Sequence, residues 1–193
     1  MSPEVAHERF TCKTITYTEM LALLNACPDE LSLQGSAAIL LSQRAKQTPK
    51  EATEHDALIA LLSLLSTSQD MSVRWAIAKH PLTPVTILET LSSDSINLVR
   101  ALVATNASTP ISILKKLFND EKIVRDGLSG NPSTPLKYLL ILADDTDAMV
   151  RLRILENPAC TEALCERLLN DPAPNVQSAA HSKLKRLHHV PSH

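Results

Sequence analysis

Hydrophobic positions in the C-terminal two thirds of the chain recur at the spacing of short amphipathic helices. Val73, Ala76 and Ile77 follow an i, i+3, i+4 pattern, and the same pattern returns one unit later from Val99. A second apolar stripe follows each first stripe. Examples of the second stripe are Ile87, Leu88 and Leu91, and then Ile113, Leu114 and Leu117.

These stripes belong to a sequence repeat of 25 or 26 residues. A valine followed by arginine or glutamine marks each unit, near positions 73, 99, 124, 150 and 176. In the first four units asparagine or histidine comes seven residues later, and two leucines and an aspartate follow. A Thr-Pro pair precedes the leucines in three of these units and is replaced by Thr161-Glu162 in the fourth. A fixed period of this length is the signature of a solenoid. The recurring polar residues are His80, Asn106, Asn131 and Asn157, and the closing aspartates are Asp94, Asp120, Asp145 and Asp171.

Each unit is predicted to form two short helices. The asparagine or histidine is placed at the end of the first helix, where we expect a left-handed backbone conformation that asparagine tolerates. The proline that follows in most units cannot continue a helix. The second helix is expected to begin with threonine as its N-cap and proline at its first position, as in Thr83 and Pro84. Helices this short need stacking between units for stability.

The pattern Val-Arg-x-x-Val-Ala-x-Asn-Pro-x-Thr-Pro-x-x-x-Leu-x-x-Leu resembles the leucine-rich repeat variant family, bacterial repeats similar to HEAT repeats. The resemblance covers roughly residues 70–187. It implies an all-α, right-handed solenoid of two-helix repeats without a β-sheet horseshoe. It also implies an N-terminal iron–sulfur module bound by cysteines. This chain departs from that implication, because only Cys12 and Cys27 precede the repeats.

The chain is predicted to divide into a helical N-terminal cap over residues 1–70, a solenoid over 71–187 and a frayed tail over 188–193. In the cap, Thr16 and Glu19 have the spacing of a capping box before a helix over Met20–Ala26. Helices are also expected over Ser36–Lys46 and His55–Leu65. They flank a Thr-Pro pair at 48–49, which suggests a degenerate repeat with an insertion.

Composition narrows the class of protein further. The 193 residues are 44% hydrophobic but only 3% aromatic, with 3 glycines and 12 prolines, which argues against β-sandwiches and glycine-rich phosphate loops. The net charge of −2 gives no general attraction to nucleic acid or to an anionic membrane. No apolar run is long enough to cross a bilayer, and the N-terminus does not resemble a signal peptide. We therefore expect a cytoplasmic protein with four reduced cysteines.

One arginine per unit is the strongest candidate for chemistry. A row of guanidinium groups along the solenoid could bind an acidic protein segment or a phosphate backbone. The structural alternative, which we favour, is that each arginine pairs with one of the closing aspartates. The arginines are Arg74, Arg100, Arg125 and Arg151.

Against this constant frame, several positions vary from unit to unit. Variable positions on a fixed frame are how solenoids form binding surfaces. Trp75, the only tryptophan, could be an exposed anchor for a partner, or it could pack under the N-terminal cap, which we favour. The varying positions are Trp75, Ala101, Asp126 and Leu152 after the arginine-containing pair, and Lys79, Thr105, Gly130 and Glu156 before the polar residue.

The function predicted from sequence is a non-catalytic scaffold that binds an unidentified protein or peptide on the solenoid surface, with Trp75 and the arginine row as the candidate contact residues. No enzyme motif is present, and no cofactor or metal site is predicted, since Cys160 and Cys165 lack a zinc-site spacing. One alternative is a nucleic-acid-associated module using the arginine row, which the charge balance does not favour. The other is an iron–sulfur or redox protein using Cys12 and Cys27.

Overall fold

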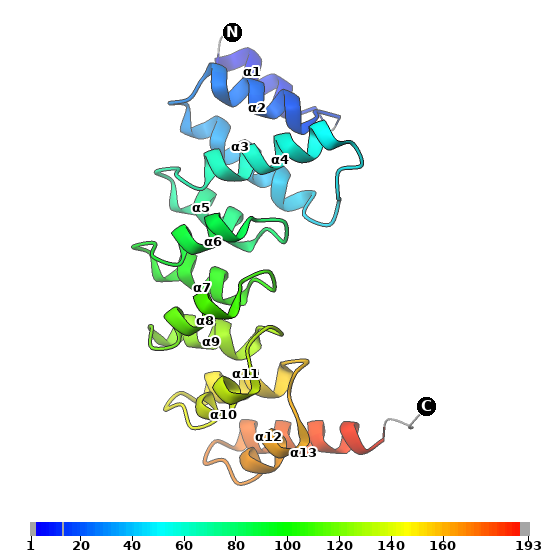
Figure 1. Cartoon of the computed structure of the whole chain (residues 1–193), viewed down its shortest axis with the longest axis vertical. Helices are drawn as coiled ribbons and strands as arrows, with labels where there is room; N and C mark the ends of the chain where they lie inside the picture. Colours follow the sequence, from blue (N-terminus) through cyan, green and yellow to red (C-terminus); the bar gives the residue numbers. More distant parts are fainter. Residues whose placement is uncertain (1–2, 13, 190–193) are drawn as a thin grey trace.

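A computed structural model describes residues 3–12 and 14–189 of the chain. All of the regular secondary structure in these ranges is α-helical, with 13 helices that follow one another along the long axis of the molecule (Figure 1). The predicted all-α solenoid is therefore confirmed as a stack of helices in chain order. The right-handed sense of the superhelix stays a prediction.

The N-terminal part contains four helices: α1 (Pro3–Phe10), α2 (Tyr17–Ala26), α3 (Leu31–Gln43) and α4 (Ala52–Leu65). The predicted capping box is confirmed, because Glu19 N donates to Thr16 Oγ1 and Thr16 N donates to the Glu19 carboxylate. Helix α1 was not predicted. Helix α3 begins and ends earlier than the expected Ser36–Lys46, and α4 begins three residues before His55.

Each of the four complete repeats contains a first helix of nine residues and a second helix of seven. The last unit has only a first helix, α13 (Pro174–His188), which includes the start of the predicted tail; positions 190–193 lie outside the described residues. The four complete pairs are α5 (Met71–Lys79) with α6 (Val85–Leu91), α7 (Asn97–Thr105) with α8 (Ile111–Leu117), α9 (Lys122–Gly130) with α10 (Leu136–Leu142), and α11 (Ala148–Glu156) with α12 (Glu162–Leu168).

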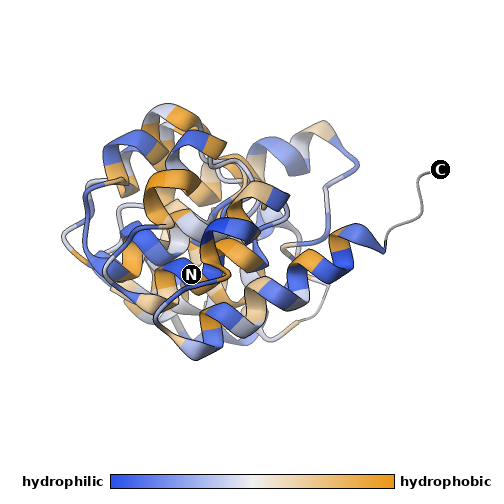
Figure 2. Cartoon of the chain, turned by 90° about the horizontal axis from the view of Figure 1, so that it is seen from below, coloured by the Kyte–Doolittle hydropathy of each residue, from blue (hydrophilic) through white to orange (hydrophobic). Residues whose placement is uncertain are grey.

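First helices pack directly on one another, and second helices pack chiefly against the first helices before and after them. Helices α1 and α3 extend this row of first helices beyond α5 into the N-terminal part. The predicted stripes are buried apart from Leu102, which is half-buried, and helices carry both hydrophobic and hydrophilic positions (Figure 2). Stacking of amphipathic helices thus provides the core that no single unit could form.

The start of the second helix differs from the prediction. Pro84, Pro110 and Pro135 are the N-cap residues, and the threonine before each proline does not cap the helix. Instead, the buried threonine hydroxyl donates to a carbonyl near the end of the preceding first helix, as Thr83 Oγ1 does to Ile77 O at 2.7 Å. That carbonyl also accepts from the C-cap amide, His80 N, at 3.1 Å, so the hydroxyl gives it a second hydrogen bond at the end of the helix.

Gly127 lies at the closest approach between neighbouring first helices, α7 and α9. A Cβ atom at Gly127 would stand 2.7 Å from the backbone oxygen of Ala101. By contrast, a Cβ atom at Gly35 in α3 would have no heavy atom within 4 Å. A methyl group is therefore excluded at Gly127 and has room at Gly35, so these two positions form a matched pair for substitution.

We predict that Gly127→Ala lowers the free energy of unfolding by about 1–3 kcal/mol, because the backbone of α7 must shift to admit the methyl group. Gly35→Ala should instead raise it by about 0.5–1 kcal/mol, since alanine favours the helix and meets no neighbour. Urea denaturation of both variants measures the two changes. Equal effects of the two substitutions would contradict the close packing of α7 on α9.

Candidate functional site

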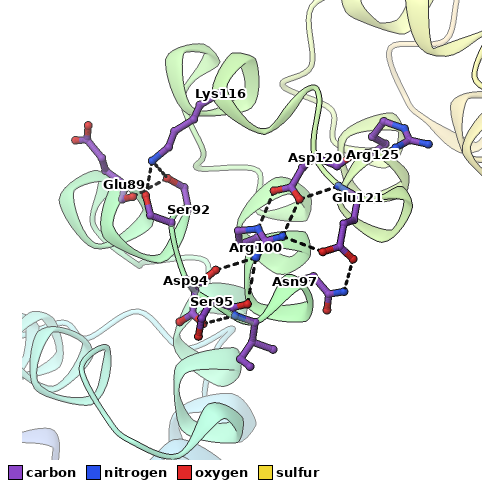
Figure 3. Close-up of polar contacts among 12 residues, drawn as sticks. Glu89, Ser92, Asp94, Ser95, Asn97, Arg100, Lys116, Asp120, Glu121 and Arg125 are labelled. Carbon is purple, nitrogen blue, oxygen red and sulfur yellow. Dashed lines mark hydrogen bonds and ion pairs between the residues drawn. The ribbon is translucent and has the colours of Figure 1, made fainter.

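The recurring arginine lies between two consecutive turns of the solenoid, as Arg100 shows (Figure 3). Its Nε and Nη2 atoms each donate to one carboxylate oxygen of Asp120, both at 2.7 Å. Its Nη1 atom donates to the backbone oxygen of Asp94 at 2.8 Å. A planar guanidinium is suited to this bidentate contact with a carboxylate. Arg100 therefore fixes the turn before its helix to the turn that ends its repeat.

The same contact recurs in all four complete repeats, and we call it the arginine ladder. Successive rungs share residues: Asp94 accepts from Arg74 through its carboxylate and from Arg100 through its backbone oxygen. The ladder is thus continuous from the Ser68 carbonyl to the Asp171 carboxylate. Its ion pairs are Arg74 with Asp94, Arg100 with Asp120, Arg125 with Asp145, and Arg151 with Asp171.

The interval from Val99 to Val124 is 25 residues rather than 26, and the difference lies in the turn after Asp120. In that turn Asp120 Oδ1 accepts from the next amide, Glu121 N. In the 26-residue units the aspartate accepts from the amide two residues later, as Asp94 does from Ile96 N. Although this turn is one residue shorter, the Asp120 carboxylate still forms its ion pair with Arg100.

The ladder carboxylates are held in their ionised form. Hydrogen bonds from Arg100 lower the pKa of Asp120 below its usual value, and those from Arg151 do the same for Asp171. Burial acts to raise the pKa of Asp94 and Asp145, but the arginine and backbone N–H donors outweigh it and both values are lowered. These ion pairs are therefore intact at neutral pH.

The preference for the structural interpretation of the arginines is supported by this geometry. Each guanidinium donates to both oxygens of an aspartate and to at least one backbone carbonyl, and its side chain is at most 24% exposed. The donors that an acidic peptide or a phosphate would need are already engaged. A contact of Arg74, Arg100, Arg125 or Arg151 with a partner stays a prediction.

A second ladder, which the sequence interpretation missed, is built from the recurring asparagines. Asn106 Nδ2 donates to the backbone oxygens of Ala78 and His80 in the preceding repeat, at 2.8 and 3.0 Å. Its Oδ1 accepts from Ser108 N, two residues later. Asn131 and Asn157 repeat both contacts. The asparagine side chain thus binds adjacent repeats together through buried hydrogen bonds.

The predicted left-handed conformation of these residues is wrong. Asn106 has φ −68° and ψ 122°, an extended backbone, and no non-glycine residue among those described has a positive φ. The extended conformation turns the side chain back toward the preceding repeat. The recurrence of asparagine was visible in the sequence, but its partner lies 26 to 28 residues earlier, beyond the reach of local capping rules.

His80 occupies the asparagine position of the first repeat. Its Nδ1 accepts from Leu82 N at 3.3 Å, which places the proton of the neutral ring on Nε2. That Nε2 atom is buried and has no hydrogen-bond partner, whereas the equivalent asparagine Nδ2 donates to two carbonyls. Burial lowers the pKa of His80 below its usual value. The asparagine ladder therefore ends at His80.

Trp75 lies at the junction between the N-terminal helices and the first repeat. It is half-buried and packs against the hydrophobic core, in line with the favoured interpretation that it packs under the cap. It also lines a pocket of about 230 Å³ together with Ser42 from the end of α3, Ala45 from the turn that follows α3, and Lys79 from α5. Lys79 Nζ lies 5.4 Å from the centroid of the indole ring, a cation–π distance.

The variable positions lie on two rows across the first helices, which we call the first-helix face. The row of Lys79, Thr105, Gly130 and Glu156 is exposed except at the half-buried Gly130. The row of Trp75, Ala101, Asp126 and Leu152 is half-buried except at the buried Ala101. At its C-terminal end, Arg153 pairs with Asp126 and Glu156.

The cysteines lie in two separate regions. Cys160 stands where the other repeats have the buried threonine, and its Sγ is 3.7 Å from the Sγ of Cys165. The two are brought together although they do not share a helix face, because Cys160 lies before α12. Burial, together with the neighbouring Cys165, raises the pKa of Cys160 to about 12. Cys12 and Cys27 are half-buried and follow α1 and α2.

Residues 3–12 and 14–189 contain no candidate metal-binding cluster and no candidate membrane-spanning helix. In this part of the chain no three His, Cys, Asp or Glu side chains are grouped so that they could hold a metal ion. Each of the helices there is too short or too polar to cross a lipid bilayer.

Comparison with known proteins gives one point of reference. No family model matches the chain, and no curated protein matches it. Among solved structures, the chain resembles a leucine-rich repeat variant. That structure, described as having a novel repetitive protein structural motif, is 18% identical, with 90% of this chain and 89% of that chain covered and a TM-score of 0.35. The solenoid fold described above rests on the helices and contacts of this chain itself.

His80 makes the stability of the protein depend on pH. The folded state keeps the ring neutral, whereas the unfolded state binds a proton near pH 6.5. We predict that the unfolding free energy of the wild type falls relative to His80→Asn as the pH decreases below about 6.5, and that the difference is constant above about pH 7.5. Urea denaturation across this range measures it. His181→Asn, at an exposed position, is the control; parallel curves for wild type and His80→Asn would contradict the prediction.

Proposed function

We propose that the protein is a non-catalytic scaffold that binds a segment of another protein along the first-helix face. The observation that carries this proposal is that constant and variable residues have different roles in each repeat. The arginine, asparagine, threonine and aspartate of the frame are engaged in contacts within the chain. The positions that differ between repeats, such as Lys79 and Glu156, are exposed to solvent. A surface whose residues differ between repeats, on a frame whose polar side chains are already engaged within the chain, is suited to the recognition of a partner.

The pocket beside Trp75 provides the anchor for such a partner. It combines the indole ring of Trp75, the methyl group of Ala45 and the cation of Lys79 at one opening. Aromatic residues in a partly desolvated pocket contribute a large share of binding energy at protein interfaces. A partner segment with an acidic residue next to an apolar one would complement Lys79 and the indole.

The face sets the length of the bound segment. Neighbouring packed helices are about 8–10 Å apart, and an extended peptide rises about 3.3 Å per residue. Each repeat therefore spans about three residues of an extended partner. The partner would run from the Lys79 end of the face toward the ion pair of Arg153 and Glu156. Lys79 favours an acidic partner residue at the first end, and the ion pair favours a partner segment without net charge at the second.

The proposal is tested by affinity capture with matched variants followed by titration. Lys79→Glu reverses the charge at the anchor, and Lys137→Glu makes the same change on α10, where Lys137 Nζ also lies over an aromatic ring, 5.0 Å from the centroid of Tyr138. A segment bound on the first-helix face should be retained by the wild type and by Lys137→Glu and weakened at least about tenfold by Lys79→Glu, a loss of about 1.4 kcal/mol.

Trp75 reports the contact directly, because it is the only tryptophan in the chain. Addition of the captured segment should change its fluorescence emission. The proposal is wrong if the captured segment binds Lys79→Glu and Glu156→Lys as tightly as the wild type and leaves the emission of Trp75 unchanged.

A further inference from the structure

The outward positions of the second helices are polar in three repeats and apolar in one. The fifth and sixth residues of these helices are Glu89 and Thr90 in α6, and Lys115 and Lys116 in α8. In α12 they are Glu166 and Arg167. In α10 the same positions hold Leu140 and Ile141, which are 37% and 56% exposed. The frame does not require apolar residues here, since the other repeats place charges at these positions.

These leucine and isoleucine side chains belong to a larger apolar surface. Leu136, one turn before Leu140 on the same side of α10, is 44% exposed, and Ile111 stands 54% exposed at the equivalent first position of α8. We call Ile111, Leu136, Leu140 and Ile141 the α10 patch. Exposed large aliphatic side chains on neighbouring second helices favour coverage by another surface.

Charges of opposite sign flank the α10 patch along the solenoid. On the α8 side Lys115 is exposed, while Lys116 Nζ is held by the hydroxyl groups of Ser92 and Ser93. On the α12 side Glu166 is exposed, while Arg167 is held by Asp144. Lys115 and Glu166 have equivalent positions on their helices. The surface is therefore basic, apolar and acidic in order along the row of second helices in Figure 1.

We propose that the α10 patch binds a second copy of this chain, with the two solenoids antiparallel. A two-fold axis along α10 packs the patch of one copy on the patch of the other. It also places α8 of each copy opposite α12 of its mate, so that Lys115 meets Glu166 twice, as an isologous interface requires. A parallel arrangement would instead set Lys115 against Lys115 and Glu166 against Glu166, so the charge pattern selects the antiparallel dimer.

The patch is centred on one helix, so the dimer is a weak one that depends on protein concentration. Sedimentation equilibrium of the full chain measures it, with concentrations from micromolar to millimolar. The wild type should pass from monomer to dimer across this range. Ile141→Lys should raise the dimer dissociation constant by more than about tenfold, because it places like charges at the centre of the interface. Thr90→Lys, the same change at the equivalent position of α6, should leave the constant unchanged.

A charge exchange tests the orientation. Lys115→Glu and Glu166→Lys should each weaken the dimer several-fold, and the double variant should restore it to within about threefold of the wild type, because it rebuilds both ion pairs in reverse. Circular dichroism and urea denaturation of each variant verify that it is folded. A wild type that stays monomeric throughout the range, or a double variant no tighter than either single one, would overturn the proposal.

Discussion

The bidentate contact between the arginine of one helix and the aspartate that closes its repeat is the constraint on which the rest of this solenoid depends. The complete repeats contain helices of nine and seven residues, which are too short to persist alone. Hydrophobic stripes hold such helices together but leave the angle between units free to vary. The guanidinium removes that freedom, because it fixes the turns at both ends of its repeat in one plane of hydrogen bonds.

Two other recurring residues, asparagine and threonine, place polar side chains in the interior of the solenoid. Asparagine Nδ2 satisfies two carbonyls of the preceding repeat, and the threonine hydroxyl satisfies a carbonyl of its own first helix. Both residues are buried at these positions, as Asn131 and Thr134 show. Because the backbone oxygens at helix ends are paired in this way, the units stack closely without an energetic penalty for unpaired groups. His80 Nε2, where the first repeat meets the N-terminal helices, and Thr161 Oγ1 are buried atoms that have no such partner.

Part of this architecture could be predicted from the sequence, since it follows from local chemistry and from period. The 25- to 26-residue spacing, the buried stripes and the pairing of Arg100 with Asp120 all depend on residues whose types recur in register. The role of Asn106 could not be found this way, because its partners are backbone atoms of another repeat. The pocket beside Trp75 was also out of reach, because Ala45 and Trp75 meet only through the packing of α3 on α5.

The most direct test of the arginine ladder is native-state hydrogen exchange on Arg100→Ala, with Arg167→Ala as the control. The ladder pair of Arg100 is mostly buried, at 15% and 17% exposure, whereas Arg167 and Asp144 are 48% and 62% exposed. Arg100→Ala should lower the unfolding free energy by about 2–3 kcal/mol, with loss of protection in α7 and α9 together. Arg167→Ala should leave the protection pattern nearly unchanged, because an exposed ion pair contributes little to stability. Equal small losses in both variants, or a loss confined to amides of α7, would contradict the account.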